Sequence, residues 1–475
     1  MTKTHPHASG AHGSPLASRL ALVVAGLLWA TMLNMSTAQA TTLQEALAAA
    51  RRQDPTVQAA LLQVDISRQQ RQASRAALQP SLGAQASTTT GRLHTDAAGT
   101  RHYDNRLAGI NLTIPLYRPQ DTARVEQAQT GEQLAQSQLA QALQTLAEQV
   151  AASYFAVLSA QDALDVAQAQ RAAIHEQFIA AQESFAAGSA TITDQQEAQA
   201  RLDLNSAQQA EARNQLQARE AAFTQLTGLP ASGLQRLALD ARLPQMPTHP
   251  QSYWEGEART QSFLVRQAEI GVQAARHGLT AAHAAHYPTV SIVSQLGGVH
   301  GQTNLTAGTP VNRSHDASAT LQVQVPLYAG GGLMAQERAS MAALSQRESQ
   351  LEAARRGATQ QARELFLALQ SSLQQAEALQ AAVRSSQLAL QSNHVGYRAG
   401  VRITIDVLNA QQQLFQARQN LAATRYAVLL NQLRLKAAVG SLNDADIAAV
   451  DTYLQAPAKP APNATTPRLQ PAAAH

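Results

Sequence analysis

The residues best suited to chemistry lie in two short segments that share one layout. The segments are "FAAGSATITDQQEAQARL" and "GYRAGVRITIDVLNAQQQLF". Each has an aromatic residue, a glycine three residues later and an aspartate nine residues after the aromatic. These residues are Phe185, Gly188 and Asp194 in the first segment, and Tyr397, Gly400 and Asp406 in the second. The second segment also contains Arg402, whose guanidinium suits two directed bonds to a carboxylate. The pattern predicts polar contacts between two turns and no covalent reaction.

A simpler interpretation of the same residues stays open at this point. Asp194 and Asp406 each follow a turn glycine, where a negative charge stabilises the beginning of a helix. Tyr397 would then be a packing residue and Arg402 a solvated charge. The residues alone do not separate the two interpretations.

Little else in the sequence suggests a reaction. His283 and His286 stand three residues apart, a spacing that a metal site can use, but no acid or cysteine pattern lies near them in the sequence. Nucleophile, phosphate-binding and paired-carboxylate motifs are missing. A formal charge of +4, with little clustering of Lys or Arg, argues against nucleic acid. The sequence therefore predicts a protein that is not an enzyme and uses no cofactor or metal.

Residues 1–40 have the layout of a secretory signal peptide. Lys3 and Arg19 precede the apolar run "LALVVAGLLWATML", and Ala38-Gln39-Ala40 forms a small-residue cleavage site. The run is shorter than the roughly 20 residues of a membrane-spanning helix, so we favour cleavage after Ala40 over a retained anchor. The sequence has no cysteine, which excludes disulfides and a lipid attached to a cysteine at that site.

The remaining chain repeats one order of elements twice. "TIPLYRPQ" and "VQVPLYAGGG" share Pro-Leu-Tyr, and "LQPSLGAQAS" and "HYPTVSIVSQL" each place a proline at the beginning of a strand. Each half is expected to run helix, strand, loop, strand, very long helix, glycine-bearing turn and returning helix. The expected strands are about 80–90, 105–117, 288–297 and 316–328, and the expected long helical tracts are about 119–228 and 333–440.

The expected strands alternate apolar and polar residues. In the last strand Leu321, Val323 and Val325 alternate with Gln322 and Gln324, a pattern typical of a half-buried strand. Four strands cannot close a barrel, and an open sheet edge cannot face lipid, so several chains must contribute. Two chains would give about eight strands around a filled interior, whereas three would give about twelve strands around a lumen.

Both long helical tracts carry apolar residues seven apart. The two series are Val407, Leu414, Leu421, Val428 and Leu435, and Leu369, Ala376, Val383 and Leu390. Heptad spacing predicts coiled-coil packing. A continuous helix from Pro119 to Phe185 would reach roughly 100 Å at about 1.5 Å per residue.

In combination, these motifs resemble the TolC family of outer-membrane channel proteins. The resemblance covers about 42–454 and rests on "TLQEALAAARRQDPTVQAA", "VPLYAGGG", "GYRAGVRITIDVLNAQQQLF" and "LNQLRLKAAVGSLNDADI". It implies an α+β membrane protein in which three copies form a barrel of about twelve strands in the outer membrane, continued by an α-helical tunnel through the periplasm. A periplasmic adaptor and an inner-membrane transporter would dock on the end of the tunnel. The expected ranges are a signal peptide at 1–40, a first repeat at 41–238, a Pro-rich linker at 239–253, a second repeat at 254–455 and a disordered tail at 456–475.

The resemblance also assigns roles to the two turn segments. They would meet at the periplasmic mouth of the tunnel, which is closed at rest by contacts between helices. Carried over by position, Tyr397 and Arg402 would contact Thr193 and Asp194 across this gate, with Gly188 and Gly400 forming the turns.

Asp406 would point into the lumen, where acids around the axis attract cations. Asn409 stands where the best-known members of the family have a second aspartate. The constriction would then hold one ring of acids instead of two, and its block by cations would be weaker.

The predicted function is the outer-membrane exit duct of a type I secretion system. A homotrimer in contact with outer-membrane lipid would pass an unfolded protein, such as an RTX haemolysin or adenylate cyclase toxin, from an inner-membrane ABC transporter and adaptor to the exterior. The alternative within this fold is the outer-membrane part of a small-molecule efflux pump; the missing lipidation cysteine favours secretion. A periplasmic coiled-coil scaffold would explain the heptads but not the alternating strand pairs.

Overall fold

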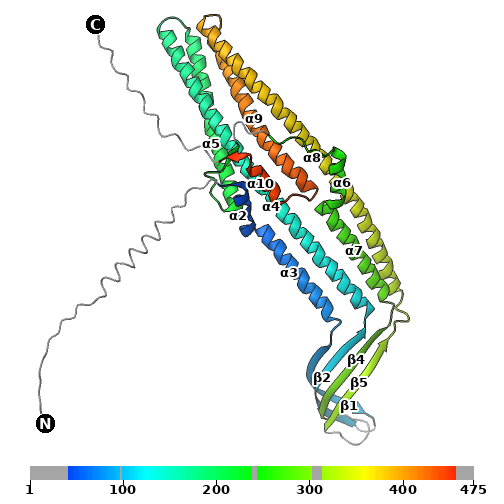
Figure 1. Cartoon of the computed structure of the whole chain (residues 1–475). Helices are drawn as coiled ribbons and strands as arrows, with labels where there is room; N and C mark the ends of the chain where they lie inside the picture. The colour runs from blue at the N-terminus through cyan, green and yellow to red at the C-terminus, as the bar shows by residue number, and fades with distance from the viewer. Residues whose placement is uncertain (1–40, 97–98, 238–242, 302–312, 456–475) are drawn as a thin grey trace, which may run out of the picture.

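The computed structural model is elongated, with a β-sheet at one end and long helices extending from it (Figure 1). It describes residues 41–96, 99–237, 243–301 and 313–455. The predicted signal peptide, its cleavage site at Ala38 and Ala40, and the predicted tail at 456–475 lie outside the described residues. None of the helices in the described part is both long enough and apolar enough to cross a membrane.

The two halves of the chain have the same order of elements, as the sequence predicted. The first half contains α2 (Leu43–Gln53), α3 (Pro55–Ala76), β1 (Ser81–Thr95), β2 (Gly99–Tyr117), α4 (Pro119–Ala186) and α5 (Ile192–Thr227). The second contains α6 (Gln251–Gln261), α7 (Phe263–Ala284), β4 (Thr289–Gly301), β5 (Arg313–Gln324), α8 (Gly332–Arg398) and α9 (Thr404–Ala438). Three short elements complete the described chain: β3 (Arg236–Leu237), α10 (Asp444–Asp451) and β6 (Leu454–Gln455).

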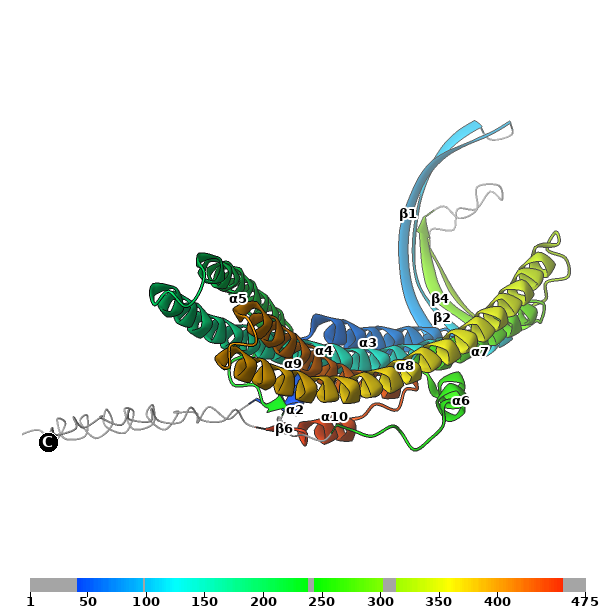
Figure 2. The same cartoon turned by 90° about the horizontal axis from the view of Figure 1, so that it is seen from above.

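The four long strands form one antiparallel sheet in the order β1-β2-β4-β5. The two halves meet where β2 pairs with β4, and Ile114 lies opposite Ile292. Strands β1 and β5 are the edges and have a pairing partner on one side only. In the view from above, the sheet curves as a segment of a cylinder wall (Figure 2).

The first hairpin is longer than the sequence analysis predicted. The polar segment between about 90 and 105 was expected to be a loop, but β1 continues to Thr95 and β2 begins at Gly99. Cross-strand polar contacts hold this extension, with Thr88 Oγ1 at 3.3 Å from Asp104 Oδ1 and His94 Nδ1 at 2.9 Å from Thr100 Oγ1. The segment was wrongly predicted to be a loop because it is polar. It forms a hairpin because its polar side chains pair across the two strands instead of packing in a core.

Two other boundaries also differ from those expected. Strand β5 ends at Gln324 instead of about 328, close to Pro326, which lacks the N–H that a sheet ladder requires. The last residues of the predicted linker at 239–253 belong to α6, which begins at Gln251 directly after Pro250.

The long helices pair into two hairpins, α4 with α5 and α8 with α9 (Figure 1). Most of the first heptad series is buried in a single chain: Val407, Leu414, Val428 and Leu435. Leu369 and Ala376 of the second series are buried too, whereas Val383 and Leu390 are half-buried. The coiled-coil face is therefore covered in part within one protomer.

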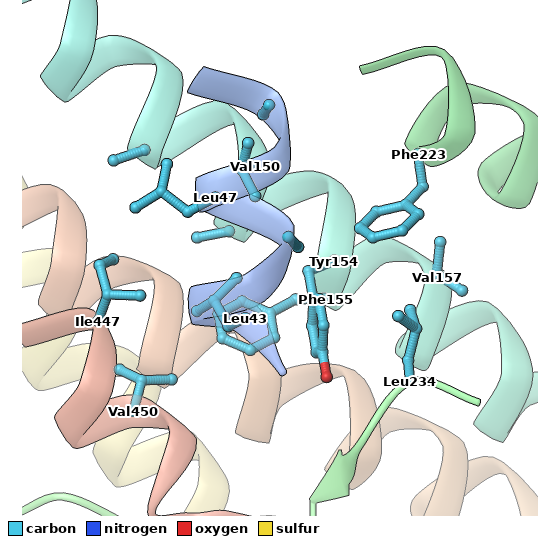
Figure 3. Packing of buried hydrophobic residues seen from close by; sticks show 14 of the residues in the cluster. Leu43, Leu47, Val150, Tyr154, Phe155, Val157, Phe223, Leu234, Ile447 and Val450 are labelled. Carbon is cyan, nitrogen blue, oxygen red and sulfur yellow. The ribbon is translucent and has the colours of Figure 1, made fainter. Parts of the chain in front are cut away.

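The largest hydrophobic cluster lies midway along the helices, not at the sheet or the tips. Tyr154 and Phe223 are fully buried in it beside Leu43 (Figure 3). The Tyr154 hydroxyl donates to the carbonyl oxygens of Thr41 at 2.9 Å and Gln235 at 3.1 Å. Helix α2 and both ends of the first half are thus fixed to α4, which leaves the two hairpins extending from a common core.

Candidate functional site at the hairpin tips

The two turn segments form the two tips of the molecule, at the end farthest from the sheet (Figure 1). One tip joins α4 to α5 and the other joins α8 to α9. Their backbones are alike: the Gly188 N–H donates to Phe185 O at 2.9 Å and the Gly400 N–H to Tyr397 O at 3.0 Å. Gly188 has φ +74° and Gly400 has φ +72°, which strains any residue with a Cβ. Both glycines are therefore required by the turns, as the sequence predicted for hairpin turns.

The first tip holds Asp194 in a capping box. Thr191 is the N-cap of α5, and its hydroxyl donates to Asp194 Oδ2 at 2.6 Å. The Thr191 N–H donates to the same oxygen at 3.0 Å, and the Asp194 N–H donates back to Thr191 Oγ1 at 3.3 Å. The carboxylate thus stabilises the beginning of α5. Thr193 beside it is exposed.

The second tip begins its returning helix differently. The N-cap of α9 is Ile403, which has no side-chain oxygen and makes no capping bond. Asp406, in the first turn of α9, instead pairs with Arg402 in the turn before the helix, with Arg402 Nη1 at 3.5 Å from Asp406 Oδ2. The Arg402 side chain is 58% exposed, so it can exchange partners, while Tyr397 is half-buried in the last turn of α8. One tip thus has an acid fixed by its capping box, and the other has an exposed arginine with a 3.5 Å ion pair.

Within the described protomer, no hydrogen bond or ion pair joins Arg402 or Tyr397 to Thr193 or Asp194. The predicted contact across the gate is therefore not formed within this protomer, and it stays a prediction. Each aspartate has a local partner in the structure, and the capping contacts of Asp194 fit the simpler interpretation, in which it stabilises the beginning of a helix.

Near the tips, Arg201 makes a direct polar link between the two hairpins, and the sequence analysis missed it. From α5, Arg201 Nη2 donates to Asn409 Oδ1 at 2.9 Å and Nη1 donates to Gln412 Oε1 at 2.8 Å, both on α9. Leu202 packs next to it with Leu408 of α9 and Ile174 of α4. The available signal was spacing, since Arg201 lies two helical turns beyond Asp194 and so shares its face of α5.

Asn409 therefore accepts a hydrogen bond from Arg201, a contact that the comparison with a ring of lumen acids did not predict. The sequence analysis treated it only as a missing acid. In the structure its carboxamide oxygen accepts from a guanidinium whose charge is shared with Glu197 at 3.5 Å. Asn409 thus helps to hold the Arg201 guanidinium between the two hairpins.

Replacing Arg201 with Ala is expected to loosen the link between the tips. Two hydrogen bonds from a charged donor that is 25% exposed contribute about 1 kcal/mol after solvent screening. Amide hydrogen exchange in 192–205 and 404–412 should then become roughly fivefold faster. Arg213→Ala, an exposed position on the same helix, is the matched control and should leave exchange unchanged. Equal exchange in both variants would show that the apolar contact of Leu202 alone joins the tips.

The histidine pair from the sequence analysis lies at the opposite end, near the sheet. His283 Nδ1 is 3.0 Å from Glu337 Oε1 and His286 Nε2 is 3.5 Å from Glu337 Oε2. Glu337 of α8 thus lies beside the two histidines, although no acid lies near them in the sequence. Even so, no group of three or more His, Cys, Asp or Glu in the described part of the chain could hold a metal ion.

Comparison with known proteins decides what this architecture is. A family model described as "Outer membrane efflux protein" matches residues 37–229 and 254–441. The chain belongs to the outer membrane efflux protein family. The resemblance to TolC seen in the sequence is confirmed, because the chain is 30% identical to Outer membrane protein TolC of Escherichia coli over 91% of this chain and 89% of that protein.

Other members support the same assignment. The chain is 31% identical to Proteases secretion protein PrtF of Dickeya chrysanthemi over 89% of this chain and 93% of PrtF. The crystal structure of CusC, at 19% identity, matches with a TM-score of 0.73 over 84% of this chain and 92% of CusC, which shows the shared fold. As an outer membrane efflux protein, the chain is a non-enzymatic channel that lies in the outer membrane and extends into the periplasm.

Proposed function

We propose that this channel is the exit duct of a type I secretion system. It passes an unfolded protein from an inner-membrane ABC transporter and a periplasmic adaptor to the exterior. The observation that supports secretion best is the similarity to PrtF, a protein named for protease secretion, along nearly the whole of both chains. An RTX-type toxin fits this class of cargo.

The sheet supports a homotrimer as the working assembly. Its edge strands β1 and β5 each leave one side without a partner in the described chain, and an open edge is not tolerated in lipid. Pairing β5 of one copy with β1 of the next closes the sheet, and three copies give about twelve strands around a lumen. The long helices of three copies then form the tunnel below the barrel.

We infer that the hairpin tips are the periplasmic gate of this tunnel. Arg402 and Tyr397 of one copy would reach Thr193 and Asp194 of its neighbour, and Asp406 would face the lumen. The support is geometric. The two tips lie at the same end of the molecule, Arg402 is exposed, and its ion pair with Asp406 is long, at 3.5 Å. Arg201 and Asn409 would fix the two tips of each copy to one another, so that they move as a unit.

The alternative function is the outer-membrane part of a small-molecule efflux pump. The description of the family favours efflux as a general activity. Nothing in the tip geometry selects a small molecule over an unfolded chain, so a cell-based comparison is needed.

Deleting the gene and comparing two properties of the cells separates the two functions. Secretion predicts that at least one large protein disappears from the medium and accumulates inside the cell, while susceptibility to drugs and detergents changes little. Supplying the intact gene on a plasmid should restore the secreted protein. An unchanged set of secreted proteins together with a large rise in drug susceptibility would assign the channel to efflux instead.

A further inference from the structure

The register of the sheet separates its side chains into two faces. One cross-strand row joins Leu82, Leu112, Ser294 and Ala319, and another joins Ala84, Ile110, Leu296 and Ala317. Side chains alternate between faces along a strand, so every second row lies on the same face. Leu82 is 72% exposed, Leu296 60% and Leu321 64%, and all three lie on this face. We call it the apolar face; in the outer membrane it contacts lipid.

The apolar face changes character toward the end of the sheet that is farthest from the helices. The next two rows on the same face are Ala86, Ala108, Gly298 and His315, and then Thr88, Arg106, His300 and Arg313. We call Arg106, His300, Arg313 and His315 the basic belt, and all four are exposed. The belt continues beyond these rows to Arg92 and His102, which pair across β1 and β2. Apolar rows thus give way to a basic band that crosses all four strands.

At the level of the Ala86 and Thr88 rows, the positive charge lies on one face. The rows on the opposite face at the same level are Ser87, Leu107, Val299 and Ser314, and Gln85, Gly109, Gly297 and Asp316. They contain no basic residue and one acid. On the apolar face the acid of this region is Asp104, which lies 3.5 Å from Arg106. The belt therefore carries an excess of positive charge that points away from the inside of the barrel.

The belt also lies at a defined depth in the membrane. Tyr117 and Tyr328 are exposed beside the helical end of the sheet, where aromatic residues mark the edge of the hydrocarbon. From Tyr117 to Arg106 along β2 is about 27 Å along the membrane normal, at about 3.3 Å per residue and a tilt near 40°. This distance matches the apolar band of a membrane barrel, about 25 Å tall. Arg106 and Arg313 therefore lie at the opposite interface, among the headgroups of the outer leaflet.

We propose that the basic belt binds the phosphate groups of lipids with a net negative charge in the outer leaflet of the outer membrane. Arginine makes paired hydrogen bonds to phosphate oxygens and holds its charge at any physiological pH. The belt is continuous with the apolar face, so one lipid can bury its chains on the lower rows and place its headgroup on the upper ones. Pairing of β5 with β1 of a neighbouring copy would continue the belt from one copy to the next. The inference rests on the outer-membrane location and not on the identity of the cargo.

Retention of lipid by the purified full-length protein tests the proposal. The protein is extracted in detergent with equal amounts of phosphatidylglycerol, phosphatidylcholine and lipid A, and the bound lipids are measured by native mass spectrometry. Lipid A and phosphatidylglycerol should be retained in preference to phosphatidylcholine. The preference should fall steeply as salt rises, since the contact is electrostatic and exposed. An R106Q/R313Q double variant should retain at least about fivefold less lipid A than the intact protein.

The matched control is an R276Q/R356Q double variant. These arginines are 64% and 78% exposed on α7 and α8, compared with 70% for Arg106. It should retain lipid A like the intact protein, which shows that removing exposed charge elsewhere has no effect. An R106K/R313K variant keeps the charge and should retain an intermediate amount, and it also serves if the glutamine variant fails to assemble. Competition by millimolar inorganic phosphate should be weak, because a free ion lacks the chains that contact the apolar rows.

Three outcomes would overturn the proposal. One is equal retention of lipid A and phosphatidylcholine by the intact protein. Another is equal retention of lipid A by the belt and control variants when both form the same oligomer. Full displacement of lipid A by inorganic phosphate would also contradict it, because the belt would then be a site for free anions.

Discussion

A Leu321→Arg variant is expected to lose about 2 kcal/mol of assembly free energy, because it would place a guanidinium in the apolar band of the bilayer, between its interface and its middle. Leu321 lies on the apolar face in the row of Ile114 and Ile292, and its side chain is 64% exposed in the single chain. The neighbouring variant Gln322→Arg should assemble normally, because adjacent residues of a strand point to opposite faces and Gln322 faces the water-filled interior. The yield of heat-modifiable trimer in outer-membrane fractions measures the effect.

The two variants differ by one position and introduce the same side chain. Charge, size and strand propensity are therefore matched, and only the face differs. Val323→Arg, nearer the helical end of β5, should show a smaller defect than Leu321→Arg, since the cost of a charge falls toward the interface. Equal defects for Leu321→Arg and Gln322→Arg would mean that the faces of the sheet have been assigned the wrong way round.

The sequence predicted the fold well because its strongest signals are periodic. Alternation in strands and heptads in helices depend on neighbours along the chain, and the repetition of Pro-Leu-Tyr and of the glycine turns gave each signal twice. The error in the first hairpin occurred where the stabilising contacts cross between strands. His94 and Thr100 are only six residues apart, but a polar segment such as theirs resembles a loop in sequence. Their contact shows only once the two strands are paired.

The candidate site was predictable only in part, for a similar reason. The turns were predictable since Gly188 and Gly400 must adopt a positive φ, and this requirement is local. The capping role of Asp194 was open from the sequence and depends on Thr191, three residues away. Arg201 was missed because its partners Asn409 and Gln412 lie on the other hairpin, more than two hundred residues along the chain. No pattern within one helix identifies such a partner.

Replacing Arg402 with Ser and Tyr397 with Phe is expected to raise single-channel conductance in planar bilayers without changing the yield of trimer. A partly exposed charged contact contributes about 0.2–1 kcal/mol. Three copies of the gate would then favour the closed state by up to about 3 kcal/mol, or roughly a hundredfold in the equilibrium between closed and open. Arg398→Ser, an exposed arginine in the same turn of the chain, is the matched control and should conduct like the intact protein.

Two further variants show whether Asp194 or Asp406 binds Arg402 in the closed gate. If Asp194 of the neighbouring copy is the partner, Asp194→Asn should raise conductance as the double variant does. That change also breaks the capping box of α5, so Thr191→Ala, which breaks the cap and keeps the carboxylate, is its control and should leave conductance low.

If Asp406 is instead the resting partner, as within the protomer at 3.5 Å, Asp194→Asn should have no effect and Asp406→Ala should open the gate. Asp406→Ala should reduce cation selectivity as well if Asp406 lines the lumen, because Asn409 beside it is neutral. A channel that opens on Asp406→Ala with its selectivity intact would place Asp406 at the tip contact and outside the pore.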